Sequence, residues 1–199
     1  MKRLLIYVFT TLTTTLLTLA CSTTPKQGAE ISSRMDTSAY KNLIQENTRH
    51  AIDYEGFYNK FEIYATFINT DVQTAILQRR SDSLQWDTRK AQSEREKLFQ
   101  ESATQTHFAV SFYVPSVRLN DLHKGNSIWK IYLVSGGERY EGRATKQNGK
   151  LEDLLAIYPY HNRWSIAYEV TFNIPLSAVE GKPATLIITS TQGTAELQF

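Results

Sequence analysis

Cysteine is nearly absent from this chain, which has a single one, Cys21, among its 199 residues. A lone cysteine has no partner for an intrachain disulfide or a CxxC redox pair, and it cannot build a cysteine-ligated metal site. The folded part of the chain must therefore be stabilised by packing. We expect no cofactor and no metal.

Net charge is also nearly absent. The formal charge is +2, and Lys2 and Arg3 account for all of it, so a chain without these two residues is neutral. A neutral chain has no basic excess with which to bind nucleic acid or anionic lipid. We therefore expect no nucleic-acid partner.

Catalytic motifs are absent too. The sequence contains no GxSxG nucleophile elbow, no phosphate-binding GxxxxGK[ST] loop and no HExxH zinc motif. The carboxylates Glu152 and Asp153 are adjacent, but they lack the apolar context that would separate two pKa values for acid and base roles. We therefore predict no catalytic residue.

The histidines occur singly along the chain. His107 alternates with Phe108, so the pattern predicts a solvated histidine on the outer face of a strand rather than a metal ligand. Asp121 and His123 are two residues apart in "RLNDLHKGN", where they could act together as a general base or form a weak metal site. The same stretch is more typical of a polar loop.

The N-terminus has the pattern of an export signal. Lys2 and Arg3 precede an apolar and threonine-rich run over residues 4–19, and the small residue Ala20 stands directly before Cys21. The run is shorter than the about 20 mainly apolar residues of a transmembrane helix. The sequence therefore predicts a signal peptide over residues 1–20 that is cleaved.

The run Leu17-Thr18-Leu19-Ala20-Cys21 resembles the lipobox of bacterial lipoproteins. The resemblance implies cleavage before Cys21 and acylation of its thiol, which would anchor the chain to a lipid bilayer of the cell envelope. Two or more acyl chains anchor a protein stably. Ser22, where inner-membrane retention would require Asp, implies the outer membrane if the source is a diderm bacterium.

Residues 21–38 are predicted to be the lipidated N-terminus and a flexible tether, because the segment from Ser22 is polar and has hardly any large apolar side chain. As a coil this tether would span roughly 20–25 Å. Residues 39–199 are then enough for a single domain. A short helix around Tyr40 and Ile44 is predicted to lead into it.

Most of the domain shows the period of β-strands. Apolar residues alternate with polar ones over 57–67, 108–114, 129–133, 166–174, 186–188 and 195–199, and glycine-containing turns separate many of these segments. The pattern predicts a mainly β, α+β fold: an antiparallel β-sandwich of the Ig-like or transthyretin-like type. Trp129 shares the buried face of its strand with Ile131 and Leu133.

A helical insertion interrupts the strands at about residues 70–104. This segment has no glycine or proline and is rich in strong helix formers. Asn69 or Thr70 can cap its start, and Asp87 can cap a second helix, which predicts a hairpin or a bent helix. Its alternating charges are typical of a solvated helix face.

One segment stands out as a candidate binding site, "AIYPYHNRWSIAY". Tyr160, His161, Arg163 and Trp164 follow Pro159 in an expected connection between strands, and aromatic residues with arginine are enriched at recognition surfaces. The alternative is that Tyr158 and Trp164 turn inward and close one end of the sandwich. We expect Trp164 to be structural, and Tyr160 and Arg163 to be exposed.

The chain is also similar to bacterial lipoproteins without an assigned activity, which have a Trp-bearing strand, a helical insertion and a Tyr-Pro aromatic loop. The sequence thus predicts a non-enzymatic lipoprotein that serves as a binding or assembly module of the envelope. Two alternatives stay open: an enzyme on cell-wall or surface polymers, and a subunit of a secretion or motility apparatus. Convergence of Tyr160, His161, Arg163, Asp121 and His123 in one pocket would favour the enzyme.

Overall fold

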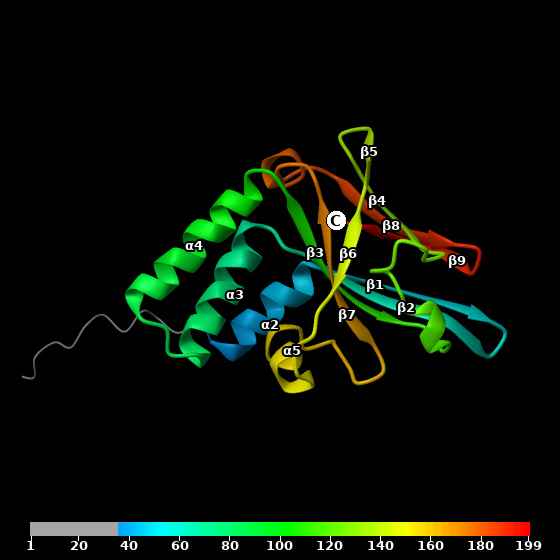
Figure 1. Ribbon diagram of the computed structural model, residues 1–199, viewed down its shortest axis with the longest axis horizontal. Coiled ribbons are helices and arrows are strands. Elements are labelled where there is room, and N and C mark those ends of the chain that lie inside the picture. The colour runs from blue at the N-terminus through cyan, green and yellow to red at the C-terminus, as the bar shows by residue number, and fades with distance from the viewer. Residues whose placement is uncertain (1–35) are drawn as a thin grey trace, which may run out of the picture. The chain divides into compact units, whose positions relative to one another are not determined.

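The computed structural model describes residues 36–199, and within them the chain forms two antiparallel sheets and four helices (Figure 1). This confirms the predicted β-sandwich with a helical insertion. The predicted signal peptide, Cys21 and most of the predicted tether lie outside the described residues. No helix within residues 36–199 has the length and apolar character needed to span a membrane.

The strands form one sheet of five and one of four. The five-stranded sheet has the order β1 (Thr48–Glu55), β2 (Tyr58–Phe67), β3 (Thr106–Tyr113), β7 (Ile166–Phe172) and β6 (Arg143–Lys146). The four-stranded sheet has the order β5 (Glu138–Glu141), β4 (Lys130–Ser135), β8 (Ala184–Ser190) and β9 (Gly193–Gln198).

The main core lies between the two sheets. Alternate residues of β3 and β7, among them Phe108 and Val170, meet residues of the second sheet such as Leu133, and all three are fully buried. Trp129 is 3% exposed and packs in this core, as its strand pattern predicted. The two-residue period therefore identified the inner faces of these strands correctly.

Both sides of the sandwich are closed. On one side the chain passes from β5 to β6 through Gly142, where a Cβ atom would lie 2.6 Å from Cε1 of Phe172. On the other side β1 lies beside β9, and Nε of Arg49 donates a hydrogen bond to the carbonyl of Gln198 over 2.7 Å. The two sheets are therefore joined at the bend around Gly142 on one side and by the hydrogen bond of Arg49 to Gln198 on the other.

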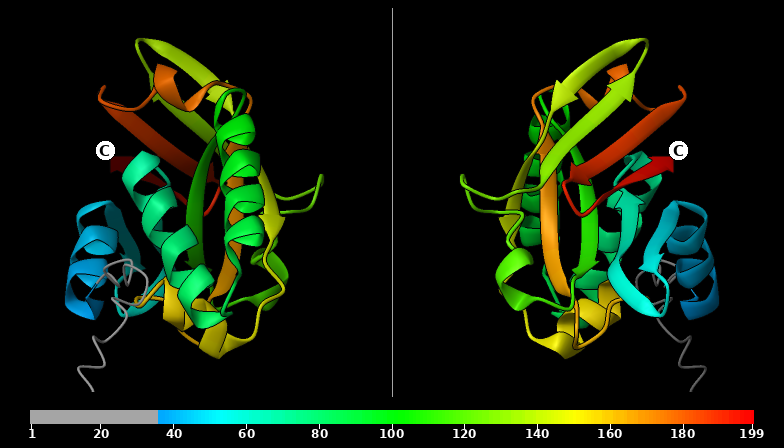
Figure 2. Two further views of the ribbon diagram at one scale, coloured as in Figure 1. Left: turned by 90° about the vertical axis from the view of Figure 1, so that its left-hand side faces the viewer. Right: turned by 90° about the vertical axis from the view of Figure 1, so that its right-hand side faces the viewer.

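The helices cover the outer face of the five-stranded sheet. Figure 2 shows α3 (Thr70–Ser83) and α4 (Thr88–Ser102) in front of that sheet, with α5 (Leu151–Ile157) below them. The Asn69 and Asp87 side chains cap α3 and α4 by accepting hydrogen bonds from the backbone N–H groups of Val72 and Lys90. This confirms a helical hairpin with the predicted caps.

A second, smaller core lies among the helices. Tyr40 of α2 (Thr37–Glu46) donates its hydroxyl to the carbonyl of Ile157 over 2.9 Å, and Nε of Arg79 donates to the carbonyl of Ala156 over 2.6 Å. The last turn of α5 is thus held by α2 and α3. The buried members of this core are Tyr40, Ile44, Val72, Ala75, Ile76 and Ile157.

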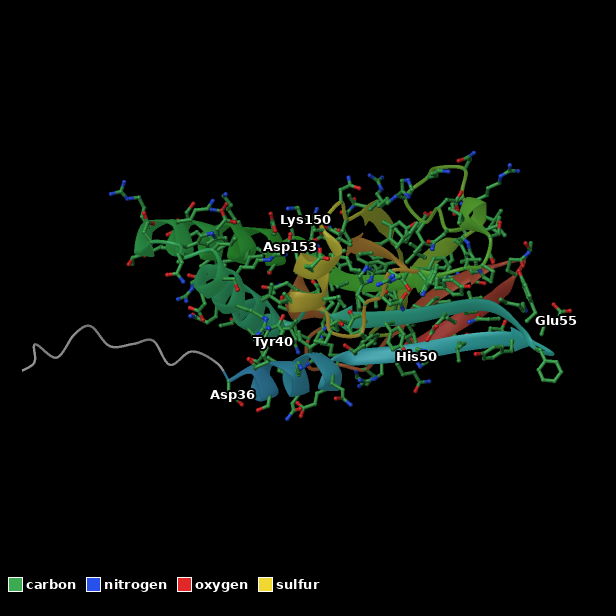
Figure 3. All side chains as sticks on the ribbon, turned by 90° about the horizontal axis from the view of Figure 1, so that it is seen from below. Asp36, Tyr40, His50, Glu55, Lys150 and Asp153 are labelled. Carbon is green, nitrogen blue, oxygen red and sulfur yellow. The ribbon has the colours of Figure 1, made fainter. Side chains whose placement is uncertain are left out.

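The hairpin between β1 and β2 differs from the predicted pattern. Phe57 was expected on the buried face, but it lies in the turn and is fully exposed. Gly56 has φ +62°, and the register shifts between Asp53 and Tyr54, so the alternation of β2 does not extend into the turn. Figure 3 shows Glu55 of this hairpin at the far end from Asp36, where the described chain begins.

Candidate functional site

The aromatic segment divides into an inward and an outward part. Trp164 is 74% exposed and Arg163 is exposed, because the Asn162 side chain accepts hydrogen bonds from the backbone of Trp164 and Ser165 and holds a tight turn. The expectation that Trp164 is structural is therefore wrong, whereas the exposure of Arg163 is confirmed.

Tyr160 points inward, so the expectation that it is exposed is also wrong. Its hydroxyl lies 2.6 Å from the hydroxyl of Thr66, and its ring stacks on Tyr64 with centroids 5.3 Å apart. Burial raises the pKa of the Tyr160 hydroxyl above its ordinary value, so it stays protonated. The side chain joins the loop to β2.

His161 is buried beside a serine. It is 6% exposed, and its Nδ1 lies 2.8 Å from Oγ of Ser111, which is 3% exposed. Burial lowers the pKa of the His161 imidazole, so the neutral form predominates at pH 7. The pair is a serine hydroxyl within hydrogen-bond reach of a neutral imidazole.

Both His161 and Tyr160 line a cavity of about 510 Å³, which is within the range of roughly 300–1,000 Å³ that small-molecule sites occupy. Its walls come from α3, α4, α5 and the outer face of the five-stranded sheet. Apolar side chains predominate on the helical side: Leu77, Leu98 and Leu154 come from the helices, and Leu84 and Trp86 from the turn between α3 and α4.

Small residues on the sheet and a loosely packed helix together leave this space open. Ala109, Ser111 and Ala167 occupy the cavity side of β3 and β7, whereas the other face of β3 carries Phe108 and Phe112. Helix α4 has no buried residue along its whole length. A layer of helices over short side chains therefore encloses a volume that the protein does not fill.

Among the groups of the cavity wall that make no hydrogen bond within residues 36–199 are three donors: the Arg80 guanidinium, the Tyr158 hydroxyl and Nε1 of Trp86. Burial raises the pKa of Tyr158 to about 12, and the positive charge of Arg80 opposes this rise. Arg80 therefore lies within electrostatic range of the Tyr158 hydroxyl.

Two carboxylates in the wall are already paired. Glu94 accepts hydrogen bonds from Nζ of Lys90 and Lys97, at 2.7 and 2.8 Å, which lowers its pKa to about 2. Glu169 lies 3.1 Å from Nδ1 of His107 and accepts a hydrogen bond from Gln147 over 2.9 Å, and the contact with His107 is the main cause of its lowered pKa. Glu94 is thus neutralised by two lysines, whereas Glu169 is held by hydrogen bonds and lies within electrostatic range of Arg80.

The position of His107 corrects another expectation. It lies on the predicted outer face of β3, but its side chain is only 13% exposed and its Nε2 is buried without a partner in the described part of the chain. The prediction of a solvated histidine is wrong because the helices cover that face of the sheet.

The five residues whose convergence in one pocket would favour an enzyme do not all line this cavity. Tyr160 and His161 line the cavity, whereas Arg163, Asp121 and His123 do not. Asp121 instead accepts a hydrogen bond from Ser127, and His123 stacks on Tyr168 with centroids 5.8 Å apart. Both belong to the polar loop.

Sequence reasoning missed Ser111, Arg80 and Trp86 as parts of a site. The signal for Ser111 was a strand with small residues at alternate positions, because such a strand leaves room above it. Arg80 and Trp86 are residues of an ordinary amphipathic hairpin, and only the fold brings them to the cavity. No cluster of three or more His, Cys, Asp or Glu residues within 36–199 could hold a metal ion.

The chain matches no protein-family model, no curated protein and no solved structure. What the site can bind must therefore follow from its own residues.

Proposed function

We propose that this chain is a membrane-anchored lipoprotein of the cell envelope, and that its domain binds a small ligand without transforming it. The lipobox-like run ending at Cys21 supports the anchor, and Ser22 supports outer-membrane delivery in a diderm bacterium. The cavity of about 510 Å³ between the helical hairpin and the five-stranded sheet carries the binding role. The cavity suits a small ligand because its wall is mainly apolar and contains a few polar groups without partners.

The anchor is tested by Cys21→Ser, which removes the only thiol that can be acylated. We expect the wild type to enter the detergent phase in phase partitioning and the variant to stay in the aqueous phase. Circular dichroism should be the same for both proteins, because Cys21 precedes the predicted domain of residues 39–199. Equal partitioning of the two proteins would rule out the lipoprotein.

The binding role is tested by filling the cavity. Ala167→Leu adds bulk to the cavity wall, and Ala103→Leu adds the same bulk at an exposed position after α4. Native mass spectrometry of the protein purified from envelopes should show a bound small molecule in the wild type and in Ala103→Leu, and a loss of it in Ala167→Leu. Equal loads in all three proteins, or none in any, would refute binding in this cavity.

One observation favours a second function, hydrolysis. Ser111 and His161 lie within the 2.6–3.2 Å that joins a nucleophile to its base in serine enzymes. A fluorophosphonate probe that labels the wild type, but not Ser111→Ala, would make the chain an enzyme. The absence of labelling in folded wild type would leave the pair as a structural hydrogen bond.

A further inference from the structure

We propose that the ligand of this cavity is a single-chain amphiphile with an anionic head group, bound at the head by Arg80 and Tyr158 and along the chain by the apolar side of the helical hairpin. The inference rests on the proposed function, because it names the ligand class of the same cavity. A carboxylate or a phosphate would supply the same head chemistry.

The apolar wall fits a flexible chain. Leu77 and Leu98 come from the two helices of the hairpin and Leu84 from the turn between them, and Leu154 adds to them from α5. Leu84 is 63% exposed and Leu98 is half-buried, so apolar surface that would normally be packed is left in contact with solvent. An alkyl chain would cover this surface without requiring directional contacts.

The part of the cavity that would bind the head group contains hydrogen-bond donors. The Arg80 guanidinium offers several N–H groups in a planar fork that suits a carboxylate or a phosphate, and within residues 36–199 it makes no hydrogen bond or ion pair. The hydroxyl of Tyr158 and Nε1 of Trp86 are two further donors without partners in the same wall. Donors of this kind recognise anions.

The carboxylates of the wall do not cancel this preference. Glu94 is held by Lys90 and Lys97, and Glu169 by His107 and Gln147. The third, Asp153, is exposed, as Arg80 is, so solvent and salt screen both charges. Arg80 is the cationic residue among those that line the wall, and within residues 36–199 its guanidinium makes no hydrogen bond or ion pair.

Binding is measured by isothermal titration calorimetry on the full chain carrying Cys21→Ser, which is prepared without detergent. The probes are dodecanoate, dodecyl phosphate and dodecyltrimethylammonium, each below its micelle concentration, together with acetate. We expect both anionic amphiphiles to bind at least about tenfold more tightly than the cationic one, and acetate to show no binding. Tighter binding of dodecanoate would indicate a fatty acid as the source, and tighter binding of dodecyl phosphate a lysophospholipid.

Arg80→Met should reduce the affinity for both anionic probes by about tenfold or more and leave the affinity for the cationic probe unchanged. Arg95→Met is the matched control, because Arg95 is exposed on α4 and does not line the cavity. Arg80→Lys keeps the charge and should retain part of the affinity, which separates loss of the head contact from loss of the fold. Tyr158→Phe should reduce the affinity for the anionic probes by a smaller factor.

Unchanged affinity of dodecanoate for Arg80→Met, or equally tight binding of the cationic probe, would overturn the inference. If no amphiphile binds while Ala167→Leu still loses a ligand acquired in the envelope, the ligand class is wrong and the binding role stands. If no amphiphile binds and the cavity-filling variant carries the same load as the wild type, both proposals fail.

Discussion

Replacement of Trp129 by alanine tests the main core most directly, because this side chain makes several contacts between elements. Its ring meets Phe61 and Phe112 edge-on, with centroids 5.5 and 4.9 Å apart. Its Nε1 donates a hydrogen bond to the carbonyl of Leu119 over 2.7 Å. Trp129→Ala removes the aromatic contacts and leaves that carbonyl without its donor.

The expected loss is about 3–5 kcal/mol of unfolding free energy, the range for buried aromatic residues replaced by alanine. At roughly 2–4 °C per kcal/mol for a domain of this size, the melting temperature should fall by about 6–20 °C. Trp129→Phe keeps most of the packing but leaves the carbonyl of Leu119 unpaired, so its cost should be smaller, about 1–3 kcal/mol.

Thermal and urea unfolding followed by circular dichroism measures these losses. Trp164→Ala is the matched control: this tryptophan is 74% exposed, so the unfolding free energy should change by less than about 0.5 kcal/mol. The reverse order, with Trp164→Ala the more destabilising of the two, would show that the faces of the strands and the outward turn are assigned wrongly.

Two further predictions concern the sheet corner and the buried histidine. Gly142→Ala should lower the free energy of unfolding in urea by about 1–3 kcal/mol, because its Cβ would lie 2.6 Å from the buried Phe172 ring. Gly125→Ala is the control and should lower it little, because its Cβ would meet no atom within 4 Å. Equal losses for the two variants would contradict the close approach at Gly142. Burial holds the pKa of the His161 imidazole below 6.5. Below about pH 6.5 the unfolded chain therefore binds a proton at His161 more readily than the folded chain, and the unfolding free energy decreases as the pH decreases. His161→Asn should reduce the loss of unfolding free energy between about pH 7.5 and 5.5, and an unchanged loss would contradict the assignment.

The strands and the long helices could be predicted from the sequence because their signals are local. Alternation placed Phe108 and Trp129 on inner faces, and Asn69 and Asp87 marked the starts of two helices. These features depend on neighbours a few residues away. Helix α5 was missed because a seven-residue helix covers barely two turns and gives little periodic signal.

The candidate site depended on contacts between distant parts of the chain. Tyr160 turns inward because Thr66, 94 residues earlier, accommodates its hydroxyl, and His161 is buried against Ser111, 50 residues earlier. His107 is covered by helices that the strand pattern cannot place. The cavity itself arises where side chains are too short to meet, and the sequence alone does not show which small residues will face one another.

The bridge between β1 and β9 has a consequence for the order of folding. β1 is the first described strand and β9 the last, so the sandwich closes only when both are present. Contacts between such distant segments form slowly, because long loops must close before any pairing stabilises them. In the envelope lipoprotein that we propose, the sandwich would thus stay open until β9 has been made, which leaves time for translocation and for acylation at Cys21.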